Sequence, residues 1–233
     1  MKSLFFVAVA FSCLSCFSKG KENVRTCRII FLERPEGAPE EVHLFDGTSS
    51  RKVSLPSMNF SEVITLPSGD LELGMTKDPV PKSGDLPPDA PTVKVPAEIN
   101  DFFLIVVSDP ENEILPLRML SVDAGVERPE PGQTLWINLT KYTIVGNLGR
   151  TSLLVAPGER VIGKAPLPES GYYKVHFTYQ RAEGDEFLPI MRKSWWLDAS
   201  SRNLGFITDS GGRLPRIFTF RDQRAADPAG QDE

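Results

Sequence analysis

The sequence has few of the residues that usually carry out chemistry. It contains two histidines and three cysteines among 233 residues, and two of the cysteines, Cys13 and Cys16, lie close to the amino terminus. Cys27 is then an isolated thiol, which leaves no framework of internal disulfides. We expect it as a small core or edge residue of a first strand, and an intermolecular disulfide is the alternative. The histidines, His43 and His176, are too far apart to show the ligand spacing of a zinc site. We therefore expect no catalytic residues, no metal site and no cofactor.

Two further absences narrow the class of protein. No segment contains the roughly 20 consecutive apolar residues that a transmembrane helix needs. The chain has 31 acidic and 26 basic residues, a net charge of −5, and no segment in which basic residues form a stripe. Because nucleic-acid binding leaves a basic footprint, we expect no nucleic-acid partner.

The amino terminus has the pattern of an export signal. Lys2 precedes an apolar run from Leu4 to Leu14, and small residues surround Cys13 and Cys16. A positive start, a short apolar run and a zone of small residues predict a signal peptide over residues 1–18. We therefore expect the protein to be exported.

The string Leu14-Ser15-Cys16 resembles the lipobox of bacterial lipoproteins, although Cys13 stands where that motif usually has an aliphatic residue. The resemblance covers only the amino terminus. It implies lipidation at Cys16 and a protein tethered to the membrane in the bacterial cell envelope, since several acyl chains give a stable anchor. The alternative is ordinary cleavage after Ser18, which would give a periplasmic or secreted protein.

The remainder of the chain has the pattern of short strands. Twenty prolines and 18 glycines separate runs rich in Val, Ile, Leu, Phe and Tyr. The apolar residues alternate with period two, as in Tyr173, Val175, Phe177 and Tyr179, and no stretch keeps a helical period. Short strands of this kind predict an all-β fold of the β-sandwich type.

Similar strings occur in both halves of the chain. The aromatic pair Phe102-Phe103 and the run from Glu113 to Leu117 resemble Tyr172-Tyr173 and the run from Glu186 to Ile190. We interpret the likeness as an internal duplication that gives two tandem immunoglobulin-like β-sandwich modules. A single larger sandwich whose halves merely share strand patterns is the alternative.

The expected modules are separated by a segment rich in Pro and Gly. The boundaries that we predict are a first module over 24–124, a linker over 125–133, a second module over 134–221 and a disordered tail over 222–233. The first module carries a proline-rich insertion over 78–96. We expect this insertion to form a stiff crossover on the first sandwich, and a ligand for a partner's aromatic groove is the alternative.

One short string has the appearance of a catalytic motif. Residues 208–212, Thr-Asp-Ser-Gly-Gly, resemble the segment around the nucleophile of chymotrypsin-like serine proteases, with Thr208 in place of the first glycine. That nucleophile requires a histidine base, and neither histidine lies in the sequence context of this family. We interpret the string as the turn of a β-hairpin.

Four aromatic residues form our candidate binding surface: Trp136, Tyr172, Trp195 and Trp196. Trp136 shares a strand face with Asn138 and Thr140, so we expect it on an outward face, and Tyr172 shares its face with Lys174 and His176. Strand alternation sends one of the adjacent Trp195 and Trp196 outward. Exposed aromatic rings bind sugars or anchor a protein partner; the alternative is that they pack between the modules.

These observations support three hypotheses about function. The first is a non-catalytic, exported cell-envelope protein, lipid-tethered or periplasmic, that acts as a scaffold or assembly subunit for an envelope protein partner. The second is a pair of carbohydrate-binding modules that bind a polysaccharide through exposed Trp and Tyr. The third is a hydrolase without a recognisable motif.

Overall fold

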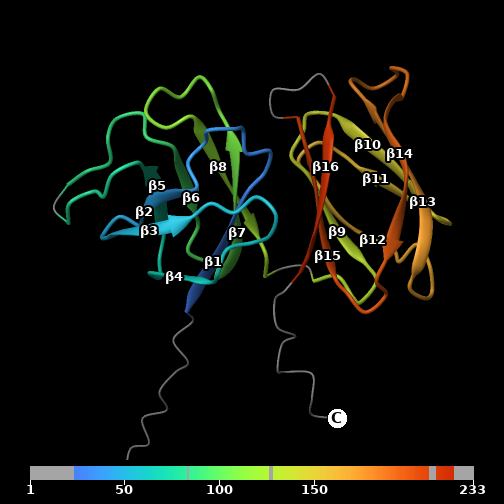
Figure 1. The fold of residues 1–233 in the computed structure, drawn as a ribbon, viewed down its shortest axis with the longest axis horizontal. Helices are drawn as coiled ribbons and strands as arrows, with labels where there is room; N and C mark the ends of the chain where they lie inside the picture. The colour runs from blue at the N-terminus through green and yellow to red at the C-terminus, as the bar shows by residue number, and fades with distance from the viewer. Residues whose placement is uncertain (1–23, 83, 126–127, 210–213, 223–233) are drawn as a thin grey trace, which may run out of the picture.

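The computed structural model describes the body of the chain, over residues 24–82, 84–125, 128–209 and 214–222. The predicted signal peptide, Cys16 and nearly all of the predicted tail lie outside these ranges. The described residues form sixteen strands in four four-stranded sheets (Figure 1). Within these ranges there is no helix, and so none that is long and apolar enough to cross a membrane.

The first module contains strands β1 to β8. Its outer sheet has the order β3-β2-β5-β6 and its inner sheet the order β4-β1-β7-β8. The outer strands are β2 (Glu41–Phe45), β3 (Ser50–Ser54), β5 (Leu71–Thr76) and β6 (Thr92–Val95). The inner strands are β1 (Arg25–Phe31), β4 (Ile64–Leu66), β7 (Asp101–Ser108) and β8 (Leu117–Asp123).

The second module contains strands β9 to β16. Its inner sheet has the order β12-β9-β15-β16 and its outer sheet the order β11-β10-β13-β14. The inner strands are β9 (Thr134–Asn138), β12 (Arg160–Gly163), β15 (Asn203–Thr208) and β16 (Arg216–Arg221). The outer strands are β10 (Thr143–Leu148), β11 (Thr151–Val155), β13 (Gly171–Gln180) and β14 (Leu188–Leu197).

The two modules have the same topology. In each inner sheet the first strand of the module pairs in parallel with the seventh, β1 with β7 and β9 with β15, and all other pairs are antiparallel. The prediction of an all-β fold with two tandem β-sandwich modules is confirmed. The strand order is not the ABED/CFG order of immunoglobulin constant domains, so the likeness to that fold lies in the two-sheet architecture.

The alignment that we made between the two halves is wrong, although the topology does repeat. Phe102-Phe103 lies on β7, which corresponds to β15, whereas Tyr172-Tyr173 lies on β13, which corresponds to β5. Strands share one alternating pattern whatever their place in a sandwich, so a short likeness between strands does not fix the equivalence.

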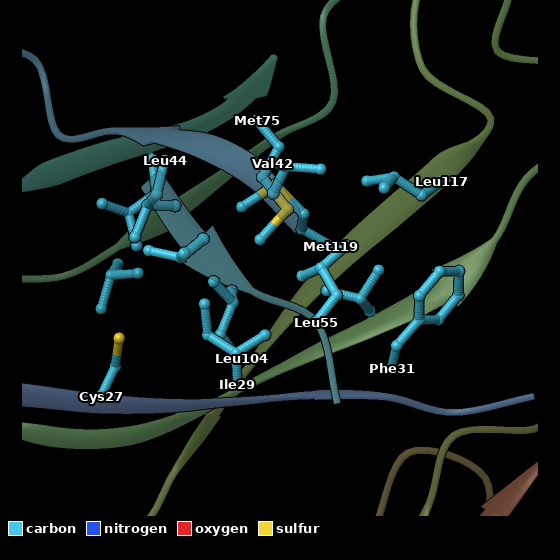
Figure 2. Packing of buried hydrophobic residues seen from close by; sticks show 14 of the residues in the cluster. Cys27, Ile29, Phe31, Val42, Leu44, Leu55, Met75, Leu104, Leu117 and Met119 are labelled. Atoms are coloured by element: carbon cyan, nitrogen blue, oxygen red, sulfur yellow. The ribbon is translucent and has the colours of Figure 1, made fainter. Parts of the chain in front are cut away.

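The modules pack on each other through their inner sheets, so that the four sheets form consecutive layers (Figure 1). Strand β1 is apolar on both faces. Ile29 and Phe31 point into the core of the first module, as Figure 2 shows. Ile30 and the following Leu32 belong instead to a second cluster, shared with apolar residues of the second module such as Phe206. Burial on both faces explains why the chain is apolar at every position from Ile29 to Leu32, at the end of β1.

Polar contacts also link the two modules. The Glu33 carboxylate, which follows β1, accepts a hydrogen bond from the Thr208 hydroxyl and pairs with Arg216 at 3.1 Å. The Arg160 guanidinium donates to the carbonyl oxygen of Asp123 at 2.9 Å. Thr208, the first residue of the protease-like string, therefore joins the two modules, and β15 and β16 form the expected hairpin. Residues 210–213 of its turn lie outside the described residues.

The proline-rich insertion does not cross between sheets, contrary to our expectation. It connects β5 to β6, which are paired neighbours in the outer sheet, and its last residues form β6. Val80 and Ala90 are buried, and the Leu86 side chain lies so close to Gly74 that a Cβ there would be 2.4 Å from it. The insertion is thus packed as part of the first module.

Cys27 is fully buried in the core of the first module, in agreement with the prediction.

Candidate functional site

The structure separates the four candidate aromatic residues into two groups. Trp136 is 1% exposed, so the expectation that it points outward is wrong. Its indole ring lies in the core of the second module, where its centroid is 5.2 Å from that of Phe177. The ring also covers Gly205, which stands directly opposite on β15.

The burial of Trp136 follows from the place of β9 in the fold. Leu135 and Ile137 face the first module, so the alternate residues face the core of the second. Asn138 and Thr140 are buried as well, and they bond to each other, the Asn138 Oδ1 accepting from the Thr140 hydroxyl at 2.8 Å. Polar residues on one face of this strand led us to expect that the face is exposed to solvent. In the structure the two polar side chains instead form hydrogen bonds with each other inside the core.

Trp195 and Trp196 point to opposite sides of β14, as strand alternation requires. Trp195 is half-buried and stacks on Trp136, with ring centroids 6.4 Å apart and an interplanar angle of 15°. Tyr173, opposite Trp195 on β13, faces the same core, and burial raises the pKa of its hydroxyl to about 12. Trp196 is 58% exposed on the other face.

Tyr172 and Trp196 form an exposed aromatic pair on the outer face of the outer sheet. They stand directly opposite each other on β13 and β14. Their ring centroids are 4.9 Å apart at an interplanar angle of 75°, an edge-to-face arrangement. Tyr172 is 74% exposed, so much of both rings remains open to solvent. This pair is what remains of the predicted aromatic surface.

An open depression of about 370 Å³ lies beside the aromatic pair on the same sheet; we call it the basic depression. It is lined by Asn147, Gly149, Lys174, Val175, His176 and Arg192. His176 on β13 stands between Asn147 on β10 and Arg192 on β14, and Lys174 lies two residues closer to Tyr172. The lining thus holds nitrogen donors from three neighbouring strands.

Sequence reasoning found only part of this site. The alternation on β13 placed Tyr172, Lys174 and His176 on one face, and the structure confirms this. Arg192 and Asn147 were missed because their positions depend on how β14 and β10 pair with β13. No signal in a single sequence sets that register.

The arrangement offers recognition groups, and we see no catalytic constellation in the described residues. His176 lies on the outer sheet of the second module, whereas His43 lies on the outer sheet of the first, with both inner sheets between them. Within the described ranges, no three His, Cys, Asp or Glu side chains gather as a metal site would require. The aromatic pair supplies apolar faces and the basic depression supplies donors and positive charge.

Comparisons with known proteins do not assign the chain to a family. A scan against protein-family models found no match, and a search of curated proteins found no significant similarity.

Proposed function

We propose that this protein is a non-catalytic, exported protein of the bacterial cell envelope that binds a glycan on the outer sheet of its second module. The observation that carries the proposal is the aromatic pair of Tyr172 and Trp196. Two large rings that stay 74% and 58% exposed and touch each other on a regular sheet face form an apolar patch of the kind that marks an interaction site.

The chemistry of the pair fits a sugar. A pyranose ring has an apolar face of C–H groups and a polar rim, so it combines stacking on an aromatic ring with hydrogen bonds at its edge. The pair stands on paired strands rather than on a loop, so the rings are held in place before binding, which lowers the entropic cost of recognition. Asn147 and Ser194 add polar groups on the same face.

The placement of the surface is consistent with a tethered protein. In the proposed lipoprotein, residues 17–24 separate the lipidated Cys16 from β1. The outer sheet of the second module is the layer that faces away from the first module (Figure 1). Intact-mass spectrometry of membrane-derived protein, with a Cys16→Ser variant beside it, tests the anchor; an unmodified mass after cleavage near Ser18 would contradict it.

The glycan proposal is tested by calorimetric titration of the full chain with a panel of envelope-type oligosaccharides. We expect Trp196→Ala and Tyr172→Ala to weaken binding strongly. Stacking of a nucleic-acid base on an aromatic side chain contributes about 1 to 3 kcal/mol, and we expect a sugar ring to lose a similar amount here. Phe187→Ala is the control, since Phe187 is another exposed aromatic residue, 43% exposed, outside the pair. Equal affinities for all three variants would refute the proposal.

A second candidate function, an assembly subunit that holds a partner protein, is favoured by a groove at one edge of the second module. A cavity of about 530 Å³ opens between the edge strands β14 and β16. Apolar side chains from both strands line it, including Met191 of β14 and Phe218 of β16, together with the 49% exposed Leu214 just before β16. The matching edge strands of the first module, β6 and β8, lie close together instead.

The occupant that this groove fits is an extended partner segment that carries apolar and acidic side chains. Edge strands accept an added strand through their free backbone groups. Lys193 lies opposite the buried Val175, so its charge points toward the groove and disfavours pairing with a second copy of β14. We expect Lys193→Glu to abolish binding to an acidic partner, and Lys141→Glu, elsewhere in the module, to leave it intact. Retained binding in Lys193→Glu would exclude this groove.

A further inference from the structure

The basic depression continues directly from the aromatic pair. Tyr172 and Lys174 lie on one face of β13, and their partners on β14, Trp196 and Ser194, lie beside them on the same face. Two residues along a strand span about 7 Å, which is comparable with one sugar unit of an extended glycan. A glycan that runs along β13 from the pair therefore brings a neighbouring sugar over the segment that carries Lys174 and His176.

The donors in the depression have no counter-charge in the part of the chain that the structure describes. Lys174 and Arg192 are exposed, and neither forms an ion pair with a described carboxylate. The six lining residues include no Asp or Glu. The protein as a whole has a net charge of −5, whereas the lining of the basic depression is positively charged.

These donors suit an anion in particular. Arg192 offers a planar fork of N–H groups that binds a carboxylate or sulfate through two hydrogen bonds, and Lys174 offers a compact positive charge. Asn147 and His176 add further N–H donors, with His176 standing between Asn147 and Arg192. Hydrogen bonds to an ionised acceptor are about twice as strong as neutral ones, so a neutral sugar would leave most of this potential unused.

We infer that the ligand is an anionic glycan, with one sugar stacked on Tyr172 and Trp196 and the acidic group of a neighbouring sugar held by Lys174, His176 and Arg192. This inference rests on the proposed function, because it takes the aromatic pair as the stacking site. The charged group is a carboxylate or a sulfate, which share this chemistry.

The test compares oligosaccharides of one length that are neutral, carboxylated or sulfated, titrated into the full chain by calorimetry. The key variant is Lys174→Gln with Arg192→Gln. The control is Lys141→Gln with Arg181→Gln, which removes the same charge from the opposite end of the same sheet. We expect the key variant to lose about tenfold or more in affinity for the anionic glycan and to bind the neutral one as before. We expect the control to match the wild type.

The possible results separate the inference from the proposed function. Stronger binding of the carboxylated or the sulfated glycan, lost in the key variant, supports the inference and shows which anion is bound. Equal affinity for neutral and anionic glycans, unchanged in the key variant, overturns the inference but leaves the proposed function standing. No binding of any glycan overturns both. Tighter binding of a single-stranded oligonucleotide, which also combines stacking with charge, overturns both as well.

Discussion

The replacement of Gly205 by alanine tests how the core of the second module is built. A Cβ at this position would lie 2.3 Å from Cε3 and 2.6 Å from Cζ3 of Trp136. Ordinary contacts between carbon atoms are about 3.5 to 4.0 Å, so the ring or the strand must shift by about 1 Å or more. The ring has little room, because Gly163 lies on its other side, where a Cβ would be 2.8 Å from Nε1.

The magnitude follows from two opposing effects. Overpacking of this kind costs about 1 to 3 kcal/mol, and we expect the upper end because the ring is held between two strands and against Phe177. The loss of glycine's freedom in the unfolded chain returns about 0.5 to 1 kcal/mol. We therefore expect Gly205→Ala to lower the free energy of unfolding by about 2 kcal/mol. Gly171→Ala is the control. The Cβ added there would lie 3.3 Å from Cδ1 of Leu167, the end of a flexible side chain that can move aside.

The assay is urea unfolding followed by far-UV circular dichroism, with equal m-values as the condition for comparing stabilities. In a Trp136→Leu background the ring is absent, so adding Gly205→Ala should cost about 2 kcal/mol less than it does in the wild type. A Gly205→Ala protein within about 0.5 kcal/mol of the wild type, or no such coupling to Trp136, would refute the placement of the indole ring on this glycine and with it the register of β9 on β15.

Three further predictions concern single buried groups. Asn138→Ala should cost about 3 kcal/mol in urea unfolding, because its side-chain amide donates to the carbonyls of Tyr142, Val155 and Ala156 inside the core; a loss below about 0.5 kcal/mol would contradict these bonds. Burial alone would raise the pKa of Asp46, but hydrogen bonds from residues 48, 49 and 51 prevail and lower it to about 2. A lowered pKa stabilises the fold above pH 4 and that contribution is lost between about pH 4 and pH 2, so the wild type should lose up to about 2 kcal/mol more than Asp46→Asn over this interval, and parallel curves would contradict the assignment. Burial raises the pKa of the Cys27 thiol to about 12, so a thiol reagent at pH 8 should label it only in denaturant; rapid labelling of the folded protein would show that the core is open.

The strand pattern predicted much of the fold because alternation is a local property. Val175, Phe177 and Tyr179 face the core as the period-two pattern indicated. The packing of the modules on each other was missed, although a signal for it was present. Runs such as residues 28–32 and 102–107 are apolar at nearly every position, which is typical of strands buried on both faces. Strands with one solvent face would have alternated instead.

The candidate site was predicted only in part, for a related reason. The residue types at 136, 138 and 140 indicated a solvent-exposed face, because sequence alone does not show that Asn138 and Thr140 satisfy each other within the core. Alternation sent one of Trp195 and Trp196 outward without showing which one. The contact of Trp196 with Tyr172 depends on the pairing of β13 with β14. The basic depression required three strands in register and so needed the structure.

Glycan binding at the aromatic pair can be observed residue by residue in an NMR titration of the indole N–H signals with the anionic oligosaccharide. The protein has three tryptophans, and they differ in environment: Trp136 is buried, Trp195 is half-buried and Trp196 is exposed. We expect a saturable shift of the Trp196 signal and of the backbone amide signals of Lys174 and Arg192, while the Trp136 signal stays in place. Binding that leaves the Trp196 signal unmoved would show that the glycan does not stack on the aromatic pair.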